Sequence, residues 1–151
     1  MFDIKNNLKL YKGFSPAVRT ATATTQACDL KGFNGAMIIA PIGATSDTLS
    51  GSVYWTFTIT HSDDDSSYST VTSNNDVTGG SLDSSTNGWL KLDLAGECQQ
   101  VYGIGYVGGK RYIKVVCTKT GTHSSGTIIG VDFAKGIPLS APVTTDSNDG
   151  A

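Results

Sequence analysis

The chain has 151 residues, of which 38% are apolar and 16% are charged, and its net charge is −2 at pH 7. This balance suits one folded domain with its own core and excludes a mostly disordered chain. The only basic cluster is the pair Lys110 and Arg111, which argues against nucleic-acid binding through phosphates. No apolar run approaches the roughly 20 residues of a membrane span, and residues 1–14 lack the apolar core of a signal peptide, so we expect synthesis in a cytoplasm.

The N-terminal segment mixes apolar side chains with lysines. Residues 1–15 keep neither a period of two nor a period of 3.6 throughout, so the pattern fits either a first strand or an arm lying on a neighbour. We therefore divide the chain into an N-terminal arm or first strand (residues 1–16), a main domain (residues 17–142) and a flexible polar tail (residues 143–151).

Three stretches of the first half read as strands. Residues 17–28 alternate Ala and Thr, which predicts a strand whose small side chains allow close approach to another surface. Residues 33–41 are apolar on both faces, as expected for a strand buried in a sandwich or beneath a subunit contact. Residues 52–60 alternate most regularly and predict the centre of the core, where each buried side chain contributes roughly 1.5–3 kcal/mol. The inward-facing set is Val53, Trp55, Phe57 and Ile59.

The middle of the chain is rich in turn residues. The run HSDDDSS predicts a hairpin with an acidic tip at residues 63–65, followed by a short strand over residues 68–72. Clustered carboxylates can bind calcium, but the spacing lacks the alternation of an EF-hand, and a tip kept in water is favoured. Residues 74–88 read as a long loop, and residues 89–94 as a half-exposed strand.

The run VYGIGYVGGKRYIKVVCTKT over residues 101–120 predicts a β-hairpin. Gly108 and Gly109 accept the positive φ angles of a two-residue turn between apolar-alternating runs. The implied register places four pairs opposite each other, Val107 with Lys110, Tyr106 with Arg111, Ile104 with Ile113 and Tyr102 with Val115, with the ring of Tyr112 covering Gly105.

A last strand is expected over residues 127–137. Together the pattern gives about eight strands, no helix, and turns between them. It predicts an all-β, single-domain β-sandwich of antiparallel strands, either jelly-roll or immunoglobulin-like.

The residues suggest no catalytic or metal site. Cys28, Cys98 and Cys117 are an odd set without CxxC spacing, which predicts buried or half-buried free thiols. His61 and His123 stand at strand ends near Ser and Asp residues, but no nucleophile elbow supports a triad. We therefore predict that the protein is not an enzyme and holds no cofactor or metal.

Five segments of the chain resemble a known group of proteins. They are DLKGFNGAMIIAPIG, FTITHSDDDSSYSTV, IGYVGGKRYIKVV, TGTHSSGTIIG and GIPLSAPV, and they cover roughly residues 28–143. This pattern resembles small structural proteins that tailed bacteriophages encode beside the major capsid gene. Residues 1–25 lie outside the resemblance.

The resemblance implies a β-rich virion component of the capsid decoration (cement) class, which stabilises the mature shell. Its expected partners are the major capsid protein and further copies of itself in a homotrimer, with neither nucleic acid nor membrane. The expected location is the capsid surface, after synthesis in the host cytoplasm. The residues expected to contact the capsid or another subunit are Phe2, Ile4, Lys5, Leu8, Lys9, Leu10, Tyr11, Lys12, Phe14, Lys110 and Arg111.

Two other interpretations remain open at the level of sequence. The first is a tail or head-completion component, which copy number per particle would separate from a decoration protein. The second is a carbohydrate-binding adhesin module that uses exposed aromatic side chains such as Trp89 and Tyr112.

Overall fold

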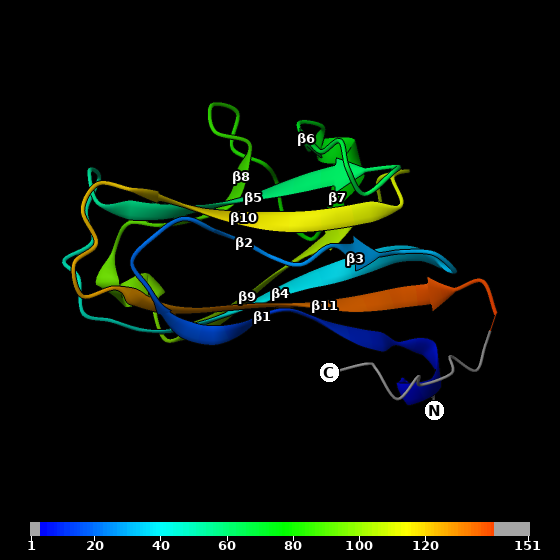
Figure 1. The fold of residues 1–151 in the computed structure, drawn as a ribbon, viewed down its shortest axis with the longest axis horizontal. Coiled ribbons are helices and arrows are strands. Elements are labelled where there is room, and N and C mark those ends of the chain that lie inside the picture. Colours follow the sequence, from blue (N-terminus) through cyan, green and yellow to red (C-terminus); the bar gives the residue numbers. More distant parts are fainter. Residues whose placement is uncertain (1–3, 141–151) are drawn as a thin grey trace.

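The computed structural model describes residues 4–140 as two antiparallel sheets packed face to face (Figure 1). The predicted all-β sandwich is therefore confirmed. The strands are β1 (Lys9–Arg19), β2 (Ala23–Thr24), β3 (Cys28–Asp29), β4 (Phe33–Thr45), β5 (Tyr54–Ser62), β6 (Ser69–Thr70), β7 (Val77–Thr78), β8 (Gly88–Leu92), β9 (Gln100–Tyr106), β10 (Tyr112–Thr120) and β11 (Thr127–Pro138). Single 3-10 turns η1 (Lys5–Asn7), η2 (Asn74–Asp76) and η3 (Ala95–Glu97) lie between them.

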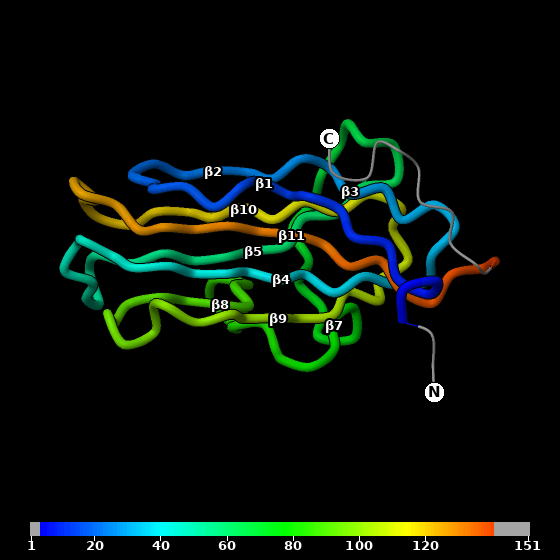
Figure 2. Tube along the Cα trace, turned by 90° about the horizontal axis from the view of Figure 1, so that it is seen from below, coloured from blue at the N-terminus to red at the C-terminus, as the bar shows by residue number. Residues whose placement is uncertain are grey.

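The strands pair as nested hairpins. Sheet A has the order β1-β11-β4-β9-β7, and sheet B has the order β2-β10-β5-β6, with β3 beside β10 and β8 beside β5. Thus β1 pairs with β11, β2 and β3 with β10, β4 with β9, and β5 with β8, all antiparallel. Figure 2 shows the long strands running side by side along the molecule. The chain crosses repeatedly between the sheets, which is the connectivity of a jelly roll.

The core lies between the inner faces of the two sheets. Trp55, Phe57 and Ile59 of β5 are fully buried, as their alternation predicts, while Val53 is half-buried just before the strand. They face the buried side chains of sheet A, among them Ile38 of β4. The strong alternation of β5 therefore places the largest apolar side chains at the centre of the sandwich.

The predicted hairpin over residues 101–120 is wrong. β9 pairs with β4 in sheet A, whereas β10 pairs with β5 in sheet B, so the segment between them crosses from one layer to the other. Ile104 lies opposite Ile38, and Ile113 lies opposite His61, instead of facing each other. Because β9 and β10 lie in different sheets, each buries its apolar side in the same core. The alternation of apolar residues in the two segments therefore fits this arrangement as well as it fits a hairpin.

The other pairs of that register are likewise absent. Tyr106 lies opposite Ala36 and Val77, Tyr102 opposite Ala40, and Val115 opposite Ile59, while Val107, Lys110 and Arg111 lie in the crossover. The ring of Tyr112 does not cover Gly105, because Tyr112 belongs to sheet B and pairs with Asp29 and Ser62.

Three further expectations need correction. Eleven strands are found in the described residues instead of about eight, and four of them have two residues. The Ala/Thr stretch of residues 17–28 is not one strand, because the chain leaves β1 after Arg19 and turns before β2 joins sheet B. Residues 74–88 are not a free loop, since they contain β7 and bury Val77 and Leu82 in the core.

The N-terminal segment contributes an edge strand. β1 pairs with β11 from Lys9 to Arg19, so it crosses the predicted boundary between the N-terminal arm and the main domain at residues 16 and 17. Bulges between Lys12 and Phe14 and between Phe14 and Ala17 break its period, which explains why the sequence shows no regular alternation there. The predicted tail and Phe2 lie outside the described residues.

Candidate interaction surface

Most of the residues on the outer side of sheet A are apolar. Across its middle, the outward-facing residues of one row are Leu10, Ala134, Met37, Gly105 and Thr78. The next row is Lys12, Asp132, Ile39 and Gly103. Leu10 is 64% exposed and Met37 is 49% exposed, so no described residue covers this side of the sheet at those positions. We call the outward-facing residues Leu10, Val18, Met37, Ile39, Pro41, Val101, Gly103, Gly105, Ile128, Ala134 and Gly136 the apolar face.

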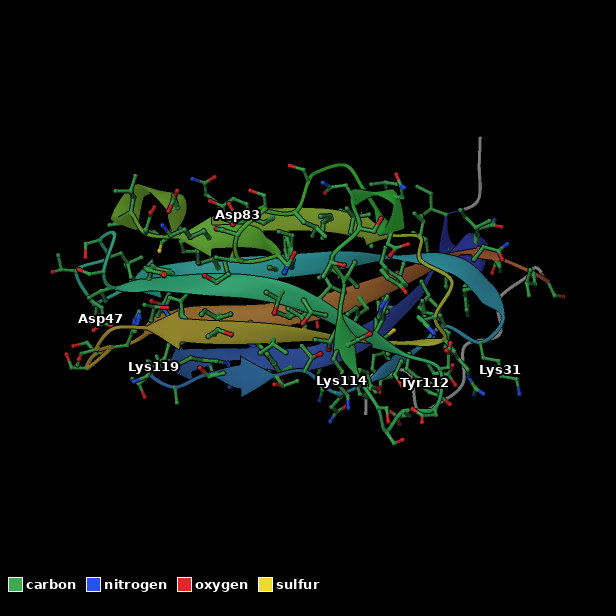
Figure 3. The ribbon with its side chains drawn as sticks, turned by 90° about the horizontal axis from the view of Figure 1, so that it is seen from above. Lys31, Asp47, Asp83, Tyr112, Lys114 and Lys119 are labelled. Atoms are coloured by element: carbon green, nitrogen blue, oxygen red, sulfur yellow. The ribbon has the colours of Figure 1, made fainter. Side chains whose placement is uncertain are left out.

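The outer side of sheet B has the opposite character. Its registered rows are Tyr112 with Ser62, Lys114 with Thr60 and Thr70, and Thr118 with Thr56 and Lys91. Figure 3 looks onto this side and shows Tyr112 and Lys114 along the same strand. Hydroxyl and ammonium groups dominate the surface, as is usual for the solvated side of an antiparallel sheet. The apolar face is thus specific to sheet A.

A shallow apolar groove of about 220 Å³ opens on the apolar face at one end of the sheet. Gly35, Gly105 and Gly136 leave its floor without side chains, and Gly35 and Gly136 lie directly opposite each other. Leu8, Met37, Val107 and Ile137 stand around it. Exposed apolar patches of this kind commonly mark surfaces that contact other molecules.

The structure separates the predicted N-terminal contact residues into two groups. Ile4, Leu8 and Leu10 expose their apolar side chains, and Lys5 and Lys12 are exposed as well. In contrast, Tyr11 and Phe14 are half-buried against the core, and Lys9 is half-buried in β1 opposite Lys135. The strand therefore directs only part of the predicted set outward.

Lys110 and Arg111 are both held in ion pairs. Lys110 Nζ contacts the Asp63 carboxylate, and Arg111 donates from Nε and Nη2 to the Asp29 carboxylate at 2.8 and 2.7 Å. The hydrogen bonds from Arg111 are the main cause that holds the pKa of Asp29 below its ordinary value. Both cations line a polar cleft of about 370 Å³. Val107 lines this cleft and also the apolar groove, so the two predicted contact regions meet at one end of the sandwich.

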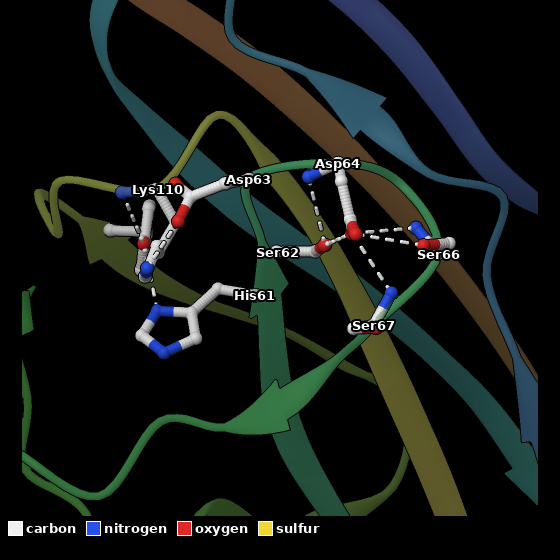
Figure 4. Close-up of polar contacts among 8 residues, drawn as sticks. His61, Ser62, Asp63, Asp64, Ser66, Ser67 and Lys110 are labelled. Carbon is white, nitrogen blue, oxygen red and sulfur yellow. Dashed lines mark hydrogen bonds and ion pairs between the residues drawn. The ribbon is translucent and has the colours of Figure 1, made fainter.

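The three carboxylates of the acidic tip have different partners, and Figure 4 shows those of Asp63 and Asp64. Asp63 turns toward Lys110, whereas Asp64 accepts hydrogen bonds from the Ser62 hydroxyl and from the Ser66 and Ser67 N–H groups. The Ser67 N–H and the other donors hold the pKa of Asp64 far below its ordinary value. Asp65 accepts from the Tyr68 hydroxyl. Among residues 4–140, no group of three or more His, Cys, Asp or Glu could hold a metal ion.

A buried His–Asp pair joins two loops at the other end, and nothing in the sequence indicated it. His123 lies between the Asp47 carboxylate, 3.2 Å from Nδ1, and the Thr120 carbonyl, 3.1 Å from Nε2. Its ring contacts Trp55 with centroids 4.6 Å apart. Asp47 also accepts the N–H groups of Ser125 and Gly126, both at 2.8 Å. Burial alone would raise the pKa of Asp47, but these hydrogen bonds and His123 together lower it.

The remaining candidate residues are packed into the fold. Cys28, Cys98 and Cys117 are buried free thiols, as predicted, and burial raises the pKa of Cys28 to about 12. His61 Nδ1 lies 3.0 Å from the Tyr106 hydroxyl, and burial lowers the pKa of His61. Trp89 is half-buried and packs edge-on against Phe57, with ring centroids 6.0 Å apart.

No protein-family model matches the chain, and no curated protein matches it. None of the helical segments within residues 4–140 has the length and apolar character needed to span a bilayer.

Proposed function

We propose that this chain is a virion structural protein that binds the outer surface of a phage capsid and stabilises the mature shell. The observation that supports it most is the apolar face of sheet A. Folding of the monomer buries one side of this sheet and leaves the other side apolar, while the outer side of sheet B is polar. A stiff sandwich with one exposed apolar face is suited to act by binding another protein.

The size of the apolar face fits a standard protein–protein contact. The four long strands of sheet A are spaced about 4.8 Å apart and rise about 3.3 Å per residue, so their whole outer side, Lys12 and Asp132 included, has a geometric area on the order of 600 Å². Standard interfaces bury about 800 Å² on each partner. The face, together with its rim of Ile4, Ile137 and Leu139, is therefore large enough to hold one specific partner.

The proposed partners are the major capsid protein and further copies of this chain in a homotrimer. A protein that binds the assembled lattice and not the separated subunits stabilises the lattice by mass action, without a reactive group. The proposed location is the capsid surface after synthesis in the host cytoplasm, with no role for nucleic acid, membrane or cofactor.

The experiment is reconstitution on particles that lack this protein. Purified protein is added to them, and bound copies are counted by quantitative mass spectrometry and cryo-electron microscopy. A decoration protein should coat the shell in hundreds of copies and raise the temperature at which the shells open. A few dozen copies at a single vertex or on the tail would instead favour the tail or head-completion alternative.

Paired variants test whether the apolar face makes the contact. Met37→Asp puts a charge on the exposed middle of that face, and Thr118→Asp puts the same charge on the exposed outer side of sheet B. We expect Met37→Asp to lower occupancy at least tenfold and Thr118→Asp to leave it unchanged. Equal occupancy for both variants would contradict the proposal.

A further inference from the structure

The polar cleft at the end of the sandwich combines three segments that are far apart in the sequence. It is lined by Leu30 and Lys31 before β4 and by Phe33 and Asn34 within it, by Asp63 at the acidic tip, and by residues 107–111 of the crossover between β9 and β10. Its volume of about 370 Å³ lies within the range of ligand sites, roughly 300–1,000 Å³. In a β-sandwich, loops at one end are carried on a rigid body and are a common place for binding residues.

The cations that line the cleft have N–H donors that the described contacts leave unused. A guanidinium has five N–H donors, and two donor positions of Arg111 are taken by Asp29. Of the three donors of Lys110, the described contacts use one, to Asp63. Within residues 4–140 no ion pair holds the exposed side chain of Lys31. Three cationic side chains and one carboxylate therefore line the cleft.

A fourth cation lies behind the cleft. Lys135 is buried, with 7% of its surface exposed, and its Nζ lies 3.1 Å from the Asp29 carbonyl oxygen and 5.0 Å from the centre of the Phe33 ring. Phe33 itself lines the cleft. Counting Asp29 and Asp63 against Lys31, Lys110, Arg111 and Lys135 leaves two positive charges in excess. The cleft is thus electrostatically suited to an anion.

The cleft is held rigid before any ligand enters. The Leu30 N–H donates to the Arg111 carbonyl at 2.8 Å, and the Lys31 N–H donates to Asp29 at 2.8 Å. On the other side, the Val107 N–H donates to the Asp76 carbonyl at 2.9 Å. A site whose frame is fixed in advance loses less entropy when a ligand binds.

We propose that this cleft binds a carboxylate side chain, Asp or Glu, of the protein on which the chain docks. The inference rests on the proposed function, because Val107 borders both the cleft and the apolar groove and a protein seated on that groove would cover both. Carboxylates match the planar donors of a guanidinium and form charge-assisted hydrogen bonds with ammonium groups. The apolar face then supplies the contact area, and the cleft fixes how the partner protein is aligned on that face.

The test uses the isolated full chain and a hexaglutamate peptide, with hexaglutamine as the uncharged control. We expect hexaglutamate to shift the backbone amide signals of residues 31–34 and 108–111 in nuclear magnetic resonance spectra, and we expect added salt to weaken the binding. Hexaglutamine should leave these signals in place. Absence of shifts with hexaglutamate at low salt overturns the proposal.

A matched pair of charge reversals locates the site. Lys31→Glu changes a cleft residue, whereas Lys119→Glu makes the same change at the opposite end of the molecule (Figure 3). Neither side chain has an ion-pair partner among the described residues, so both variants should fold. Lys31→Glu should weaken hexaglutamate binding at least tenfold, and Lys119→Glu should leave it unchanged; equal affinities overturn the proposal.

Two further outcomes separate this inference from its alternatives. Tighter binding of a trigalacturonate oligosaccharide than of hexaglutamate would overturn the protein partner in favour of an acidic sugar. Specific hexaglutamate binding at the cleft by a chain that never coats particles would refute the proposed function and leave carboxylate recognition by the cleft supported. Particle coating that Lys31→Glu does not weaken would overturn the role of the cleft in docking.

Discussion

The outer sides of the two sheets differ although both sheets bury the same core. In sheet B, β5 alternates strictly, so that Trp55 and Phe57 face inward and Thr58 and Thr60 face solvent. In sheet A, β4 is apolar on both sides, with Ile38 inward and Met37 and Ile39 outward. Folding requires only the inner side to be apolar. The outer side of sheet A is therefore more apolar than the folding of the monomer requires.

The largest expected effect contrasts neighbouring residues of β4. Ile38 is fully buried, so Ile38→Ala should lower the free energy of unfolding by about 2–5 kcal/mol through lost burial and a residual cavity. Ile39→Ala, on the outward side, should cost less than about 1 kcal/mol. Urea unfolding of the two variants measures the difference. Equal losses would show that the outward side is already packed in the monomer.

The next effect separates stability from docking. Asp47→Asn should lower the free energy of unfolding by about 1–3 kcal/mol, because an amide cannot offer acceptor oxygens to both the Ser125 and Gly126 N–H groups. Asp47 lies at the other end of the sandwich from Lys31 (Figure 3). Below its melting temperature the variant should coat particles like the wild type, and loss of coating would tie docking to this end instead.

The loss of stability caused by the same substitution should depend on pH. The pKa of Asp47 is lowered in the folded protein, so its stabilising contribution is complete above the unfolded value of about 3.9 and is lost as the pH falls through the folded value. The gap in stability between wild type and Asp47→Asn should be constant above about pH 5 and should shrink below about pH 4. Unfolding curves at several pH values measure it, and a gap that widens in acid would contradict the assignment.

A smaller effect concerns the apolar face in the free protein. Leu10→Lys and Thr118→Lys both place a lysine at an exposed position, on sheet A and sheet B respectively. Each should change stability by less than about 0.5 kcal/mol, as surface substitutions usually do. Only Leu10→Lys should reduce the fluorescence of a dye that binds exposed apolar surface. Equal dye binding by both variants would show that the face is not accessible in solution.

The sequence predicted the fold class because its strongest signals are local. Alternation in residues 52–60 identified β5, and the two-sided apolar run in residues 33–41 identified the strand now seen as β4 and raised the idea of a contact on its outer side. Pairing was not predictable in the same way. Gly108 and Gly109 look like a hairpin turn, but the strands on either side bury equally well in two different sheets.

The candidate sites depend on distant residues, which explains what was missed. Asp47 and His123 meet through loops that carry no common motif, and Asp29 meets Arg111 because β3 pairs with β10. That Lys110 and Arg111 contact another protein stays a prediction, and the sequence did not indicate the carboxylates of Asp63 and Asp29 that hold them. Residue type is visible in a sequence, whereas nested strand pairing decides which residues become neighbours.

The smallest expected effect tests the shape of the apolar face. A Cβ at Gly103 would lie 2.5 Å from Met37 Cε, the far end of a flexible side chain, so Gly103→Ala should move Met37 at little cost in stability. A Cβ at Gly13 would instead lie 2.5 Å from the Val131 carbonyl oxygen, which is backbone, and Gly13→Ala should be clearly destabilising. If the flat face is what the partner contacts, Gly103→Ala should reduce particle coating several-fold while the midpoint of urea unfolding stays nearly constant. Coating that is unaffected by Gly103→Ala would mean that the partner contacts the rim of the face and not its centre.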